Sequence, residues 1–179
     1  YSTKEQNVLR LGFLGRVVPI KNLEWILAHD ELSGIKLDVH GIIEDNNYWE
    51  EFQKMARVKG LCVEYFGPFK AKDLPRIYKG LDMVYNPSFS ENYGHAMVQA
   101  WCHGVPVLAT KNSPWQQLEE YNAGYLIDPN IPNKAILENL ISMREKEFSQ
   151  LRVGAKKFAK EIIHKTTTKS DYLDFFDEI

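Results

Sequence analysis

The sequence predicts a single α/β domain in which a doubly wound parallel sheet carries helices on both faces. Short runs rich in β-branched and aromatic residues alternate with segments of helical periodicity along the chain, which is the pattern of a parallel sheet. The 179 residues, 44% of them hydrophobic, suit one ordinary domain with a sizeable core. Because no repeat, low-complexity tract or linker divides the sequence, we treat residues 1–179 as one domain.

Strands are expected where short apolar runs end near a glycine or a polar residue. The predicted strands cover residues 8–13, 36–40, 63–66, 83–86, 105–110 and 125–127. Pro106 is compatible with the fifth of these strands, because proline is tolerated near the start of a strand.

Helices are expected in the connections between the strands. Asn22 is a predicted N-cap for a helix that begins at Leu23, and Asn47 is a second predicted N-cap, with Glu50 three residues later as in a capping box. Residues 113–114, a Ser-Pro pair, are expected to start a further helix. The other predicted helices span residues 71–79, 94–102, 133–143, 147–163 and 169–176.

Charge and composition exclude several classes of function. The 22 basic and 24 acidic residues leave no positive excess for a nucleic-acid backbone, so no nucleic-acid partner is expected. The longest uncharged stretch, residues 92–110, contains Asn, His, Gln, Gly and Pro and is not a membrane span. With balanced charge and no signal-peptide pattern at its start, the chain is expected in the cytoplasm.

In a doubly wound sheet, ligands bind outside the carboxyl ends of the strands, where helix N-termini also lie. Arg16 and Lys21 follow the first predicted strand, and together they can hold one anion. The alternative for this pair is an ordinary solvated loop. A lysine near a helix start is unfavourable by itself, which slightly favours an anion there.

Residues 87–95, with the sequence PSFSENYGH, are the most informative loop. Gly94 permits a ligand to approach the backbone, and the N–H groups of residues 94–97 (Gly94, His95, Ala96 and Met97) would face a phosphate group. Glu91 and Gln99 lie eight positions apart, about two helical turns, and suit the hydroxyl pairs of a sugar and a ribose. An alternative of similar weight is that Glu91 only stabilises the start of the helix by its charge and that Gln99 is an ordinary surface residue.

The motifs typical of dinucleotide-binding domains, P-loop proteins and serine hydrolases are missing from the sequence. The sequence has no Gly-x-Gly-x-x-Gly, no Gly-Lys-Ser/Thr and no Gly-x-Ser-x-Gly motif. His95 and His103 have no third ligand at metal spacing, and Cys62 and Cys102 are far apart, so no metal site is expected.

Together these segments resemble the C-terminal, donor-binding half of a GT-B glycosyltransferase of retaining family 4, a Rossmann-like domain. The likeness runs from Phe13-Leu14-Gly15-Arg16 to Gly124-Tyr125-Leu126, and its best-matched segment lies within residues 86–107. In that family Gly15, Arg16 and Lys21 would correspond to the loop that grips the donor diphosphate.

The family's Glu-x7-Glu motif corresponds to Glu91 and position 99. The resemblance implies that Glu91 contacts the transferred sugar, that position 99 holds the ribose, and that Asn92 and Tyr93 with Gly94 shape the pocket. This chain has Gln99 where the family has glutamate. An amide can still accept from one hydroxyl and donate to another, with less charge assistance.

The resemblance also implies an activity. A hexose would pass from a nucleotide diphosphate sugar, of UDP or GDP type, to a glycan or lipid acceptor with retention of configuration. No cofactor or metal would be needed, because the cations and helix amides offset the charge on the leaving diphosphate. The acceptor would bind an N-terminal domain that is absent here, so this chain alone is expected to bind nucleotide weakly and transfer nothing.

Several alternatives stay open at this point. Gln99 is also consistent with a catalytically inactive nucleotide-sugar-binding module, and the fold alone with a GT-B epimerase or phosphorylase. The base could contact residues 67–68 or 42–44. Through its absent half, the full-length protein would reach the inner face of a membrane, and the apolar face of residues 169–176 is expected to favour self-association.

Overall fold

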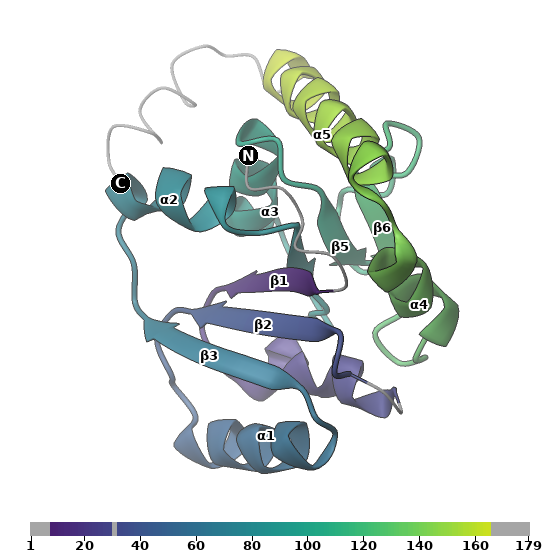
Figure 1. The fold of residues 1–179 in the computed structure, drawn as a ribbon. Helices are drawn as coiled ribbons and strands as arrows, with labels where there is room; N and C mark the ends of the chain where they lie inside the picture. Colours follow the sequence, from purple (N-terminus) through teal and green to yellow (C-terminus); the bar gives the residue numbers. More distant parts are fainter. Residues whose placement is uncertain (1–7, 30–31, 166–179) are drawn as a thin grey trace.

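The computed structural model of the chain describes residues 8–29 and 32–165. Its centre is a parallel sheet with the strand order β3-β2-β1-β4-β5-β6 (Figure 1). The strands are β1 (Leu9–Leu14), β2 (Ile35–His40), β3 (Cys62–Gly67), β4 (Met83–Asn86), β5 (Val107–Thr110) and β6 (Gly124–Ile127). The order changes direction between β1 and β4, and this switch point is where a doubly wound sheet binds ligands.

Helices cover both faces of the sheet, as expected (Figure 1). The α-helices are α1 (Asn46–Val58), α2 (Leu74–Lys79), α3 (His95–Cys102), α4 (Lys134–Ser142) and α5 (Glu145–Lys165). Short 3-10 helices are η1 (Pro19–Lys21), η2 (Leu23–Ala28) and η3 (Ala71–Asp73). The predicted helix at residues 169–176 lies outside the described residues.

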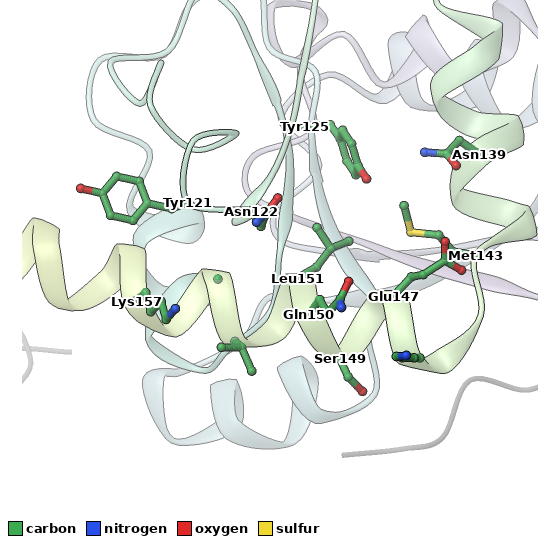
Figure 2. A pocket seen from close by; sticks show the side chains of 13 residues that line it. Tyr121, Asn122, Tyr125, Asn139, Met143, Glu147, Ser149, Gln150, Leu151 and Lys157 are labelled. Atoms are coloured by element: carbon green, nitrogen blue, oxygen red, sulfur yellow. The ribbon is translucent and has the colours of Figure 1, made fainter.

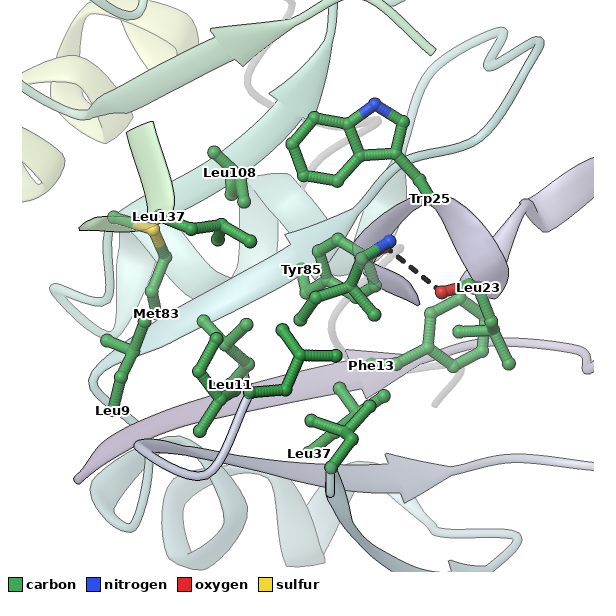
Figure 3. Packing of buried hydrophobic residues seen from close by; sticks show 14 of the residues in the cluster. Leu9, Leu11, Phe13, Leu23, Trp25, Leu37, Met83, Tyr85, Leu108 and Leu137 are labelled. Atoms are coloured by element: carbon green, nitrogen blue, oxygen red, sulfur yellow. Dashed lines mark hydrogen bonds between the residues drawn. The ribbon is translucent and has the colours of Figure 1, made fainter. Parts of the chain in front are cut away.

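Two apolar clusters hold these layers together. One lies between the sheet and η2, α1 and α4, and contains Trp25, Tyr85 and Leu137 (Figure 3). The other lies between the sheet and α2, α3 and the second half of α5. Within β4 the side chains alternate between the clusters: Met83 and Tyr85 enter the first, and Val84 enters the second. Burial on both faces explains why β4 is apolar from Met83 to Tyr85.

Asn22 does not have the predicted role of an N-cap. Its backbone is left-handed, with φ of 54°, and its side chain makes no capping bond to the 3-10 helix that follows. Instead the buried amide donates to the carbonyl of Pro87 at 3.2 Å and to that of Pro129 at 3.0 Å. Asn22 therefore ties the connection after β1 to the loops that follow β4 and β6.

Substitutions of Asn22 should separate the contribution of its side-chain hydrogen bonds from that of its left-handed backbone. Asn22→Ala is expected to lower the free energy of unfolding by about 2 kcal/mol, because two buried carbonyls lose their donor and alanine resists a left-handed backbone. Asn22→Gly removes the donor but accepts the backbone, so it should lose less. Urea denaturation of the three proteins checks this order, and equal stability for all three would contradict it.

Two other predicted helix starts are wrong. The N-cap of α1 is Asp45, whose Oδ1 accepts from the N–H of Tyr48 at 2.9 Å, and Asn47 lies inside the helix. No helix begins at residues 113–114; the segment up to residue 122 is a series of turns whose N–H groups bond three residues back. Its Trp115 packs on Trp101 and Phe158, so tertiary contacts outweigh the local helix signal.

Candidate functional site

A cavity of about 220 Å³ opens at the switch point, between the carboxyl ends of β1 and β4 and the start of α3. Its lining comes from three separate segments of the chain. The lining residues are Phe13, Leu14, Gly15, Arg16, Lys21, Val84, Tyr85, Asn86, Glu91, Gly94, His95 and Ala96. The structure thus brings seven of the predicted site residues around one space: Gly15, Arg16, Lys21, Glu91, Gly94, His95 and Ala96.

Lys21 and Glu91 form an ion pair within this cavity. The distance from Lys21 Nζ to Glu91 Oε2 is 2.8 Å, and the two side chains are only 19% and 14% exposed. Their loops are joined, because the carbonyl of Ile20 accepts from Ser88 Oγ at 3.1 Å and from the N–H of Phe89 at 2.9 Å. The cation and the carboxylate are therefore held in fixed relative positions.

Arg16 lies at the rim of the cavity. Its Nη1 is 3.0 Å from Glu44 Oε2, and the two side chains are 63% and 39% exposed. An exposed ion pair of this kind contributes little to stability, so an anion can compete with Glu44 for the guanidinium. Sequence reasoning missed that both candidate cations are paired with carboxylates, since Glu44 and Glu91 are 28 and 70 residues away from their partners.

The start of α3 forms the anion-facing end of the cavity. Gly94 has φ of +77°, and a Cβ there would lie 2.1 Å from Met97 Cε. The first N–H groups of a helix have no carbonyl one turn earlier, so they are suited to an anion. The N–H of Met97 is different: it donates to the carbonyl of Gly94 at 2.9 Å, which corrects the prediction that it is available to a phosphate.

Gln99 lines a second, adjoining cavity of about 350 Å³. The other lining residues are Leu14, Phe69, Ala71, Leu74, His95 and Ala96, and three of them, Leu14, His95 and Ala96, also line the first cavity. Glu91 and Gln99 therefore lie at neighbouring spaces and not on one side of a single helix, because α3 begins four residues after Glu91. The adjoining cavity is mostly apolar, and Gln99 is buried at its wall.

The remaining predicted residues lie outside both linings. Asn92 is exposed, and the Tyr93 ring packs against His95 with ring centroids 4.7 Å apart. Of the segments considered for a base, residues 42–44 contribute Glu44 to the rim pair with Arg16. Residues 67–68 are not part of either lining, although Phe69 beside them is part of the second.

A larger groove, of about 770 Å³, lies at the β6 edge between α4 and α5 (Figure 2). There burial raises the pKa of Tyr125, and the side chain of Asn139 beside its hydroxyl partly offsets this. Glu119 accepts from the outward N–H of Leu126 at 2.9 Å and so occupies a donor of the edge strand. The groove is remote from the switch point, so the smaller cavity is the candidate site.

Within residues 8–29 and 32–165, no three His, Cys, Asp or Glu side chains are grouped so that they could hold a metal ion. In the same part of the chain, no helix has both the length and the apolar character to cross a membrane.

The sheet order and the cavity at its switch point define a Rossmann-like α/β domain. Residues 2–162 match the model of the family described as Glycosyl transferases group 1. The chain belongs to this family, and its fold is that of a GT-B C-terminal domain, which confirms the resemblance seen in the sequence.

Individual proteins show the same relationship. The chain is 31% identical over 85 residues to D-inositol 3-phosphate glycosyltransferase of Corynebacterium kroppenstedtii (46% of this chain, 19% of the relative). It is 22% identical over 173 residues to an uncharacterized 41.2 kDa protein in the cps region of Klebsiella pneumoniae (96% and 47%). The chain thus spans less than half the length of these curated relatives.

Solved structures share the fold. Anabaena HepE in complex with UDP superposes with a TM-score of 0.76 at 20% identity, covering 97% of this chain and 50% of HepE. The C-terminal domain of a glycosyl transferase group 1 family protein from Francisella tularensis superposes with a TM-score of 0.72 at 19% identity, covering 90% and 94%.

Proposed function

We propose that this chain is the donor-binding domain of a glycosyltransferase that moves a sugar from a nucleotide diphosphate sugar to an acceptor. One observation carries the proposal: Arg16, Lys21 and the start of α3 surround a single cavity at the switch point of the sheet. Two cations and a helix N-terminus at one place favour a ligand with several negative charges, such as a diphosphate.

The ion pairs suggest how the donor enters. A diphosphate attracts Lys21 away from Glu91 and Arg16 away from Glu44, so each cation exchanges a carboxylate for a phosphate. Glu91 is then released next to the transferred sugar, where its carboxylate accepts from a hydroxyl. As the bond to the sugar breaks, negative charge grows on the leaving diphosphate, and the cations and helix amides stabilise it without a metal.

The adjoining cavity suits the nucleoside. Its apolar wall, with Phe69 and Leu74, covers a flat base, and Gln99 offers both a donor and an acceptor to ribose hydroxyls. Because the two cavities share Leu14, His95 and Ala96, one ligand can occupy both.

The comparisons support the class of donor. HepE structures hold UDP and, in another crystal, UDP-glucose, and the latter superposes with a TM-score of 0.73 at 22% identity over 87% of this chain and 44% of HepE. The retaining course, the glycan or lipid acceptor, the cytoplasmic location, the membrane association and the inactivity of this chain alone stay predictions. Gln99 supports a second candidate, a nucleotide-sugar-binding module without catalysis; turnover restored by Gln99→Glu in the full-length protein would favour it.

A thermal-shift panel with UDP, GDP and ADP and their sugars tests the proposal. Lys21→Ala should lower the affinity for the most tightly bound ligand about tenfold or more, because a partly buried interaction between the ammonium group and a phosphate is lost. Arg16→Ala should have a smaller effect, because the Arg16 side chain is exposed. Lys54→Ala, at an exposed lysine of α1, is the control. If the Arg16→Ala, Lys21→Ala double variant keeps the full shift, the diphosphate does not bind here.

A further inference from the structure

Asn86 ends β4 at the floor of the cavity and has a polar atom without a use in the fold. The residue is only 8% exposed. Its Nδ2 donates to Glu91 Oε2 at 3.4 Å, whereas its Oδ1 is buried and has no hydrogen-bond partner among the described residues. A buried, unpaired amide oxygen is unfavourable, so its presence at a ligand cavity points to a partner that is supplied with the ligand.

Glu91 presents a second acceptor beside it. Lys21 and Asn86 both contact Oε2 of the carboxylate, and within the described residues no hydrogen bond reaches Oε1. Two acceptor oxygens thus lie on side chains that contact each other. Such a pair suits a ligand with two neighbouring donors, and adjacent hydroxyl groups of a sugar are neighbouring donors.

We propose that Asn86 and Glu91 together bind two vicinal hydroxyls of the donor sugar, with Asn86 Oδ1 accepting from one and Glu91 Oε1 from the other. This inference rests on the proposed function and adds a residue that selects the sugar. The Nδ2 of Asn86 also orients Glu91, since it holds Oε2 and leaves Oε1 for the sugar. Asn86 accordingly distinguishes a sugar with both hydroxyls from one that lacks either.

Deoxy donors combined with a variant test this contact. Calorimetry compares UDP, UDP-glucose and the 2-, 3-, 4- and 6-deoxy forms of UDP-glucose, each with the wild-type chain and with Asn86→Ala. The variant should bind UDP within about twofold of wild type but UDP-glucose about tenfold more weakly. One deoxy donor should lose clearly less affinity than UDP-glucose on Asn86→Ala, because the hydroxyl that donates to Asn86 Oδ1 is already missing.

Asn112→Ala is the matched control. Asn112 Nδ2 donates to the carbonyl of Phe89 at 2.7 Å, so its loss loosens the same loop without changing the cavity lining. Asn112→Ala should change the affinity for UDP and the affinity for UDP-glucose by the same factor. The wild-type chain alone provides a check independent of how Asn86→Ala folds: two deoxy donors modified at adjacent carbons should bind more weakly than the others.

The outcomes separate the two proposals. The sugar contact is wrong, and the donor site stands, if wild type binds UDP-glucose no more tightly than UDP. The same holds if Asn86→Ala lowers the affinity for every ligand by the same factor. If wild type binds none of the UDP, GDP and ADP ligands of the thermal-shift panel, both are wrong.

Discussion

Gly154→Ala should lower the free energy of unfolding by about 3 kcal/mol, because the added methyl group has no space. Gly154 lies in α5, where a Cβ would be 2.2 Å from the carbonyl oxygens of both Tyr121 and Asn122. These are backbone atoms of a turn that is itself anchored, since Trp101 Nε1 donates to the carbonyl of Ala123 at 3.0 Å. Alanine favours the helix by about 1 kcal/mol relative to glycine, but this gain does not offset the cost of the steric clash.

Two other glycines provide matched controls for that substitution. At Gly80 the backbone is right-handed and the nearest atom to a new Cβ is 3.5 Å away, so Gly80→Ala should be neutral or stabilising by up to about 1 kcal/mol. At Gly60 there is open space but φ is +71°, so Gly60→Ala should lose about 1 kcal/mol from the backbone alone. Urea denaturation measures all three, and a Gly154→Ala protein no less stable than Gly60→Ala would refute the packing of α5.

Arg152→Met should destabilise the fold by about 3 kcal/mol or more, because it removes a buried cation that pairs with the carboxylates of Asp82 and Glu145. Arg152 Nη2 is 3.6 Å from Asp82 Oδ1, and both side chains are buried. Asp82 Oδ2 also accepts from the N–H of Arg10 at 2.9 Å, so the pair joins α5 to the sheet beside β1 and β4. Methionine keeps much of the packing volume and removes the charge.

A double-mutant cycle isolates the electrostatic part of this effect. Asp82→Asn keeps an acceptor for Arg10 but has no charge, so Arg152→Met in that background should destabilise less, with a coupling of at least about 1 kcal/mol. Lys134→Met is the control, since its pair with Glu138, at 3.6 Å, is exposed on both sides and should change stability by no more than about 0.5 kcal/mol. Additive effects at Arg152 and Asp82 would show that the pair contributes by packing alone.

Local pattern was sufficient for much of the fold. The short apolar run from Met83 to Tyr85 is typical of a strand between two covered faces. The helices α4 and α5 lie close to their predicted bounds because their apolar residues recur at helical spacing. The cluster of site residues also followed from local reasoning, because the carboxyl ends of parallel strands meet at one edge. That rule predicts Arg16, Lys21 and Gly94 at one edge of the sheet, and all three line the same cavity.

Local sequence pattern could not predict the contacts between segments that are distant in the chain. Asn22 and Asn47 have the side chains of N-caps, but two carbonyls 65 and 107 residues away hold the first, and Asp45 caps the helix that contains the second. The pairing of Lys21 with Glu91 likewise depends on how separate loops are brought together, as does the Asn86 oxygen that has no partner among the described residues.

By itself, then, the order of residues determined the layers, the strand-rich core and the edge at which the candidate site lies, since these depend on periodicity and chain direction. Only the tertiary structure decided which side chain caps, pairs or stays unpaired. The physical reason is that a polar group is satisfied by whichever partner lies within hydrogen-bond distance, and at this cavity those partners come from segments far apart in the chain.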